Sequence, residues 1–157
     1  MKVLLIGPMR VYDIASAFKR ALESLGHQYI ALDEEASAIK IPALANKVLY
    51  RALGKKPVHY WAFNKEIVDV ARRFNPQVVL ILKGAFIAPD TLQTIRRDTQ
   101  AFRINYMTDD PFNPAASTKN IVDTIPLWDV EACTKQAIVE DVRRAGEKCS
   151  VREIRTF

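Results

Sequence analysis

Hydrophobic positions along the chain alternate between short continuous runs and stretches with helical spacing. The first run, residues 2–6, is apolar and β-rich and ends at Gly7-Pro8, which is typical of a strand buried on both faces. Apolar residues then recur at intervals of three and four over residues 11–25, which predicts an amphipathic helix that ends at Gly26. A second apolar run, residues 29–32, completes a strand–helix–strand unit of the kind that forms right-handed crossovers in a parallel sheet.

The same alternation continues to the end of the chain. Helices are expected at residues 44–53, 63–74, 89–97, 117–123 and 136–145, and strands at residues 78–82, 102–106, 128–133 and 150–154. No repeat or linker interrupts the pattern. We therefore expect one Rossmann-like, doubly wound α/β domain over residues 1–157, with a mainly parallel sheet of about six strands and helices on both faces.

Composition is compatible with this prediction. The 157 residues are 49% hydrophobic and 26% charged, as in an ordinary globular domain with its own core. The N-terminal apolar run is too short for a signal peptide, and no stretch approaches the roughly 18–20 apolar residues of a membrane span. We therefore expect a cytoplasmic protein.

The chain is basic, with a formal net charge of +5. Basic residues gather in two groups: Lys40, Lys47, Arg51, Lys55 and Lys56, and then Arg72, Arg73, Arg96 and Arg97. No nucleic-acid-binding motif accompanies them, so no nucleic acid is predicted as a partner. A solvated basic face and a surface that meets anionic lipid or a charged partner both remain open.

Metal and cofactor sites are not predicted. Cys133 and Cys149 are far from any C-x-x-C spacing and are expected to be reduced core thiols. The loop after the first strand has Gly7 but no G-x-G-x-x-G pattern, and it lacks the Ser/Thr/Gly-rich cradle that FMN requires. No Walker A motif occurs either.

Ligands of an open parallel sheet bind outside the carboxyl ends of its strands. This rule selects the loops at residues 7–10, 83–86, 108–113 and 134–135. The candidate binding residues in them are Gly7, Arg10, Lys83, Gly84, Thr108, Phe112, Asn113 and Lys135. An aromatic face beside amide and hydroxyl groups suits a polyhydroxylated ligand. Asn105 belongs to the same lining or is a satisfied core amide, while Trp61 and Trp128 are expected to be core residues.

Asp109 and Asp110 follow a strand directly and are the candidate catalytic residues. Adjacent carboxylates repel, so a purely structural loop gains little from having both. One of them could be held by backbone amides or by Lys83, while the other faces the cleft as a general base. Two structural alternatives remain open: an ion pair of Lys83 with one carboxylate, and a turn-forming role for Asp110 before Pro111.

Several blocks of sequence carry a family resemblance. In order, the blocks KVLLIGP, LGH, NPQVVLILKG, APDTLQTIR, INYMTDDPFNP and WDVEACTKQ make the chain resemble the N-terminal domain of CgeB-type (spore maturation protein) GT-B glycosyltransferases. The resemblance implies a metal-independent enzyme whose N-terminal domain holds a sugar or glycan acceptor. It implies that Asp109 or Asp110 deprotonates the acceptor hydroxyl, that Lys83, Thr108 and Asn113 position it, and that Arg10 borders the cleft.

The chain departs from that family because it stops near the expected hinge. The donor-binding half, which would hold a nucleotide sugar, is expected in a further domain or a partner subunit, and the chain alone should not turn over. In a split enzyme, residues 43–56 would suit docking to a membrane or a partner, and a homodimer could bury an exposed cleft face. The alternative is a non-enzymatic ligand-binding or regulatory α/β domain.

Overall fold

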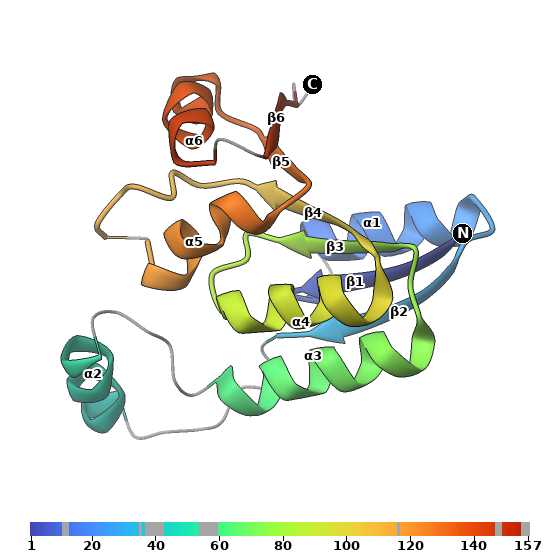
Figure 1. The fold of residues 1–157 in the computed structure, drawn as a ribbon, viewed down its shortest axis with the longest axis horizontal. Helices are drawn as coiled ribbons and strands as arrows, with labels where there is room; N and C mark the ends of the chain where they lie inside the picture. The colour runs from blue at the N-terminus through green and yellow to red at the C-terminus, as the bar shows by residue number, and fades with distance from the viewer. Residues whose placement is uncertain are drawn as a thin grey trace.

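Six parallel strands form one sheet in a computed structural model that describes residues 1–10, 13–34, 36, 43–53, 60–115, 117–146 and 149–154 (Figure 1). The strand order is β2-β1-β3-β4-β5-β6. The strands are β1 (Lys2–Gly7), β2 (Gln28–Asp33), β3 (Val78–Leu82), β4 (Phe102–Met107), β5 (Val130–Cys133) and β6 (Ser150–Glu153). The predicted Rossmann-like α/β class is therefore confirmed.

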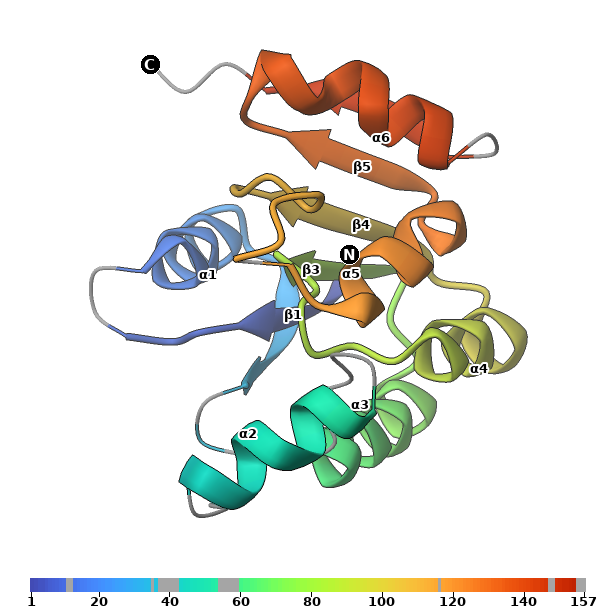
Figure 2. The ribbon, with the colours of Figure 1, turned by 90° about the vertical axis from the view of Figure 1, so that its left-hand side faces the viewer.

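Helices lie on both faces of this sheet: α1 (Ile14–Ser24), α3 (Trp61–Phe74), α4 (Pro89–Thr99), α5 (Lys119–Thr124) and α6 (Val139–Ala145). A further helix, α2 (Ala43–Ala52), projects away from the sheet (Figures 1 and 2). Figure 2 shows α1 on one face and α3, α4, α5 and α6 on the other. Right-handed crossovers explain this, because the chain steps from β1 to β2 in one direction and from β2 to β3 in the opposite direction.

The element boundaries show where local chemistry controls the chain. Gly26 follows the C-cap residue of α1, Leu25, and has a φ of 68°, as expected of a left-handed residue that ends a helix. Asn75 takes the same role after α3, with a φ of 48°. The helix expected over residues 136–145 is divided into a 3₁₀ turn, η3 (Gln136–Ile138), and α6. Val11, the first apolar position of the expected N-terminal helix, lies outside the described residues.

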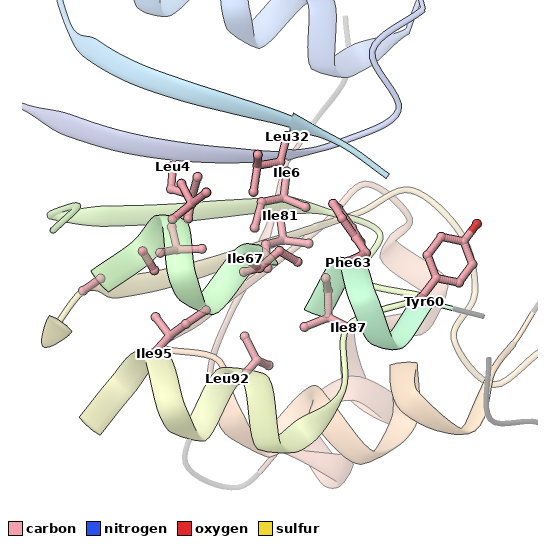
Figure 3. Packing of buried hydrophobic residues seen from close by; sticks show 14 of the residues in the cluster. Leu4, Ile6, Leu32, Tyr60, Phe63, Ile67, Ile81, Ile87, Leu92 and Ile95 are labelled. Atoms are coloured by element: carbon pink, nitrogen blue, oxygen red, sulfur yellow. The ribbon is translucent and has the colours of Figure 1, made fainter. Parts of the chain in front are cut away.

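The central strands are buried on both faces, as predicted for residues 2–6. Leu4 and Ile6 of β1 and Ile81 of β3 pack against α3 and α4 (Figure 3). Val3 and Leu5 point to the other face, where they meet Leu22 of α1. This two-sided burial explains why β1 reads as a continuous apolar run rather than as an alternation.

Both cysteines are reduced, as expected. Cys133 is fully buried and Cys149 is half-buried against the core. Burial raises the pKa of the Cys133 thiol to about 11 and that of Cys149 to about 12, so both thiols are protonated at neutral pH. Within the described part of the chain, no helix is both long enough and apolar enough to cross a membrane.

The two tryptophans have opposite environments. Trp128 is 2% exposed and belongs to the main core, as predicted. Trp61 begins α3 and is 66% exposed, so the prediction that it is a core residue is wrong. Trp61 lies in the first turn of α3, where the ring of the preceding residue, Tyr60, is the one that is buried.

Asn64 of α3 holds the start of α4 in place. Its Nδ2 donates to the carbonyls of Tyr60 (2.9 Å) and Phe86 (2.8 Å). Its Oδ1 accepts from the Ala88 amide and the Thr91 hydroxyl, both at 2.8 Å. Ala88 occupies the N-cap position of α4 and has no side chain that could cap the helix. Asn64 of the neighbouring helix satisfies the amide of this N-cap residue instead.

Replacing Asn64 with alanine should therefore destabilise the fold by about 2 kcal/mol, because four polar groups lose a partner at a half-buried site. Urea unfolding followed by circular dichroism measures this change. Asn113→Ala is the matched control, since Asn113 is exposed and its side chain accepts one bond, from Ala115. Equal effects of the two substitutions would contradict the proposed role of Asn64.

Candidate functional site

Four loops meet in a pocket of about 210 Å³ at the carboxyl edge of the sheet. The loops follow β1, β2, β3 and β4, and the lining residues are Pro8, Asp13, Ile14, Glu34, Leu82, Lys83, Thr108 and Asp109. The strand order reverses between β1 and β3, since the chain leaves β1 toward β2 and returns on the other side. The pocket thus lies at the topological switch point, where ligands of open α/β sheets bind.

Lys83 and Asp109 form an ion pair in this pocket. The Nζ of Lys83 lies 2.6 Å from Oδ2 of Asp109, and both side chains are partly exposed. The hydrogen bond from Lys83 lowers the pKa of Asp109, and the positive charge of Lys135 adds to this shift at longer range. Asp109 is therefore ionised at neutral pH, and the ion pair that the sequence left open is formed by the first of the two aspartates.

The backbone of Lys83 has an unusual conformation. Its φ is 69° and that of the next residue, Gly84, is 65°. A non-glycine residue in this region costs on the order of 1 kcal/mol, and such strain is concentrated at functional sites. The amide of Lys83 donates to the carbonyl of Tyr106 at 2.9 Å, so the sheet itself holds this sharp turn. The turn is where the chain leaves β3 and where the lysine meets Asp109.

Asp110 has a different role from its neighbour. Its Oδ1 accepts a 2.8 Å hydrogen bond from the amide of Phe112, across Pro111. This is the side-chain-to-backbone bond by which aspartate stabilises a turn. Asp110 is not among the residues that line the pocket. The turn-forming alternative is thus observed, and Asp109 is the carboxylate that faces the pocket.

The two candidate glycines serve packing. A Cβ on Gly7 would lie 3.0 Å from the Leu82 side chain. A Cβ on Gly84 would lie 3.3 Å from Oδ1 of Asn105 and 3.4 Å from the Trp128 ring. The space that a side chain would need is occupied by core residues at both positions, so the absence of a Cβ accommodates the core.

The remaining candidates are spread over the loop surface. Arg10, Phe112, Asn113 and Lys135 are exposed and do not line the pocket. The carbonyl of Arg10 accepts from the Ser16 hydroxyl at 2.7 Å, which ties the first loop to α1. Of the residues singled out from the sequence, the structure brings together Lys83, Thr108 and Asp109 in the pocket.

Two pocket carboxylates were not singled out from the sequence. Asp13 precedes α1, and its Oδ2 accepts from the Arg10 amide at 3.3 Å. Glu34 directly follows β2, is 9% exposed, and its amide donates to the carbonyl of Gly7 at 3.4 Å. The carboxyl-edge rule, applied to the strand at residues 29–32 as well, points to Glu34.

The charges of the lining residues indicate which ligand fits. Among the described lining residues, Asp13, Glu34 and Asp109 oppose a single lysine, so this part of the lining is rich in hydrogen-bond acceptors and poor in cations. Such a lining suits hydroxyl donors better than phosphate. Within the described residues, no group of three or more His, Cys, Asp or Glu side chains is arranged to hold a metal ion.

A buried polar cluster lies behind Gly84. Asn105 is 1% exposed and donates Nδ2 to Oε1 of Glu131 at 3.1 Å, so it is a core amide rather than a lining residue. Glu131 is fully buried, and its Oε2 has no hydrogen-bond partner in the described part of the protein. Burial raises the pKa of Glu131 to about 8, with the Asn105 hydrogen bond opposing the shift. At neutral pH this carboxyl is therefore mainly protonated.

Comparison with known proteins finds no family model that matches the chain and no curated protein that matches its sequence. The resemblance to CgeB-type glycosyltransferases therefore stays a prediction.

Proposed function

We propose that this chain is the acceptor-binding N-terminal half of a GT-B-type, metal-independent glycosyltransferase. The observation that carries the proposal is the pocket at the switch point. The three carboxylates and one lysine of its described lining favour a neutral, hydroxyl-rich ligand over a phosphate. The nucleotide-sugar donor would then bind to a further domain or a partner subunit. Without that half, we expect no turnover.

The proposed roles follow from the positions of three side chains. Asp109 is the general base for the acceptor hydroxyl, since it lines the pocket and Asp110 is engaged in a turn. Lys83 fixes the orientation of the Asp109 carboxylate through their 2.6 Å contact. Thr108 contributes a hydroxyl that can donate to or accept from the sugar. Because the pKa of Asp109 is low, the proton would move to it only as the new glycosidic bond forms. The bond between the sugar and the donor nucleotide would break in the same step, and the nucleotide would leave with the bonding electron pair.

A non-enzymatic ligand-binding or regulatory domain is the second candidate, and one observation favours it. The ion pair with Lys83 lowers the pKa of Asp109, which makes this carboxylate a weak base but a good hydrogen-bond acceptor. A sugar-binding module needs only the second property.

Calorimetric titration of the chain with a panel of neutral sugars and of nucleotide sugars tests the pocket. We expect a neutral sugar to bind, and we expect Asp109→Ala and Thr108→Val each to weaken binding about tenfold, because each removes a hydrogen-bonding group. Asp110→Ala is the matched control, since Asp110 is outside the pocket lining. Tight binding of a nucleotide sugar by the chain alone would overturn the acceptor-side assignment.

The two candidate functions can be distinguished by an activity assay once a donor-binding half is supplied. In the enzyme, Asp109→Asn should lower turnover by about two orders of magnitude or more, while Asp110→Asn should retain most of it. Sugar binding without transfer in the complete assembly would instead support the binding-module candidate.

A further inference from the structure

Helix α2 presents an exposed apolar stripe. Ala45, Val48, Leu49 and Ala52 follow the i, i+3, i+4, i+7 spacing of one helical face, and all four are exposed. Val48 is 58% exposed and Leu49 is 41% exposed. Beyond the end of the helix, Leu53 (43%) and Trp61 (66%) add two further large exposed side chains. We refer to these six residues as the α2 surface.

The net positive charge of the chain arises in the same segment. Residues 37–59 contain five basic residues and no acidic residue. These five positive charges equal the net charge of +5 of the whole chain, because the charges of the other residues cancel. Arg51, in the last turn of α2, is exposed. A helix that combines an apolar stripe with basic residues and no acidic ones has the character of helices that lie in the interface of a bilayer.

Helix α2 stands apart from the body of the domain. In Figures 1 and 2 it projects away from the sheet, on the side where the strands end. Among the described elements, it makes no extensive contact with the sheet or with another helix. Its apolar stripe is therefore not covered by the described part of the chain, and the stripe can meet an external surface.

We propose that the α2 surface docks this protein on an anionic lipid bilayer. The apolar stripe and Trp61 enter the boundary between headgroups and acyl chains. The exposed Arg51 meets the lipid phosphates, and the sequence supplies four more positive charges in the same segment. A second copy of the chain is a poorer occupant, because two segments that each carry five positive charges would repel. Nucleic acid would leave the apolar stripe without a role.

Docking would also place the pocket close to the lipid. The pocket loops and α2 lie at the same edge of the sheet, where the strands end. If the proposed glycosyltransferase function holds, the acceptor is then a lipid-linked or membrane-associated hydroxyl compound. This consequence rests on the proposed function, whereas docking is measured without any activity.

The experiment is flotation of the full chain with vesicles of phosphatidylcholine, with and without phosphatidylglycerol, at low and high salt. We expect binding to the anionic vesicles, weaker binding at high salt, and little binding to pure phosphatidylcholine. Both Val48→Ser/Leu49→Ser and Arg51→Glu should lower the affinity about tenfold or more. These side chains are exposed, so the variants should fold normally.

Matched controls lie at the opposite edge of the sheet. Leu25→Ser removes an exposed leucine (68%) after α1, and Arg73→Glu reverses an exposed charge in the last turn of α3. Both should bind like the wild type. Tryptophan emission gives an independent signal, because Trp61 is exposed and Trp128 is buried. A blue shift with anionic vesicles should disappear in Trp61→Phe.

Absence of vesicle binding by the wild-type chain would overturn the proposal, as would unchanged binding by the Val48→Ser/Leu49→Ser variant. Self-association that the same variant abolishes, without vesicle binding, would show that the α2 surface is a contact between copies. Sugar binding in the pocket is measured separately, so a failure of docking leaves the proposed function standing.

Discussion

Glu131→Gln should remove a fall in stability that the wild-type chain shows as the pH rises from about 4.5 to about 8. The lower limit is the ordinary pKa of a glutamate and the upper is the pKa of Glu131 in the folded protein, where burial raises it. Between these values the unfolded chain releases a proton that the folded chain retains, so the free energy of unfolding declines by about 1.4 kcal/mol per pH unit. The stabilisation is complete below pH 4.5 and lost above pH 8.

The glutamine variant retains the shape and the contact with Asn105 but cannot ionise. Urea unfolding at intervals between pH 5 and pH 9 should therefore give a flatter profile for Glu131→Gln, with higher stability than the wild type at the alkaline end. Glu153→Gln removes an exposed glutamate from the next strand and is the control for the loss of one carboxyl group at the surface. Parallel profiles for wild type and Glu131→Gln would show that Glu131 does not titrate in this window.

Asp129→Ala should destabilise the fold by about 3 kcal/mol, because it leaves a buried guanidinium without its carboxylate. Arg103 is 3% exposed and donates to Asp129 from three nitrogens: its amide (2.8 Å), Nε (2.9 Å) and Nη2 (2.7 Å). Burial raises the pKa of Asp129, but the hydrogen bonds from Arg103 outweigh it and hold the pKa below its usual value. The pair joins β4 to the start of β5, at the amino edge of the sheet.

A double-mutant cycle separates the interaction energy of the ion pair from the effect of losing one side chain. Arg103→Met/Asp129→Ala should be less destabilised than Asp129→Ala, because methionine leaves no buried charge. Asp123→Ala is the control, since its 2.8 Å pair with Lys119 lies on the surface and should contribute about 0.5 kcal/mol. If the double variant loses as much free energy of unfolding as the two single variants together, Arg103 and Asp129 are not coupled. Thermal or urea unfolding measures all four chains.

Local patterns predicted most of the elements. Residues 78–82 are β3 with the predicted bounds, and the helix expected from Pro89 begins at that residue. Glu131 shows the limit of such patterns. Its charge suggests an exposed position in the strand at residues 128–133, yet its side chain lies in the core, with Asn105 of the neighbouring strand as its hydrogen-bond partner. The solvation of a side chain depends on the elements packed over it, and these come from other parts of the chain.

The Asp109-Asp110 loop shows the same division within the candidate site. The sequence by itself determined that two carboxylates follow a strand, and hence that they lie at the binding edge of the sheet. Only the tertiary structure decided that Asp109 pairs with Lys83 in the pocket while Asp110 closes a turn. Local periodicity predicts the alternation of strands and helices, because each element must bury its own apolar face. Which loops meet depends on strand order, and strand order is set by packing between residues far apart in the chain.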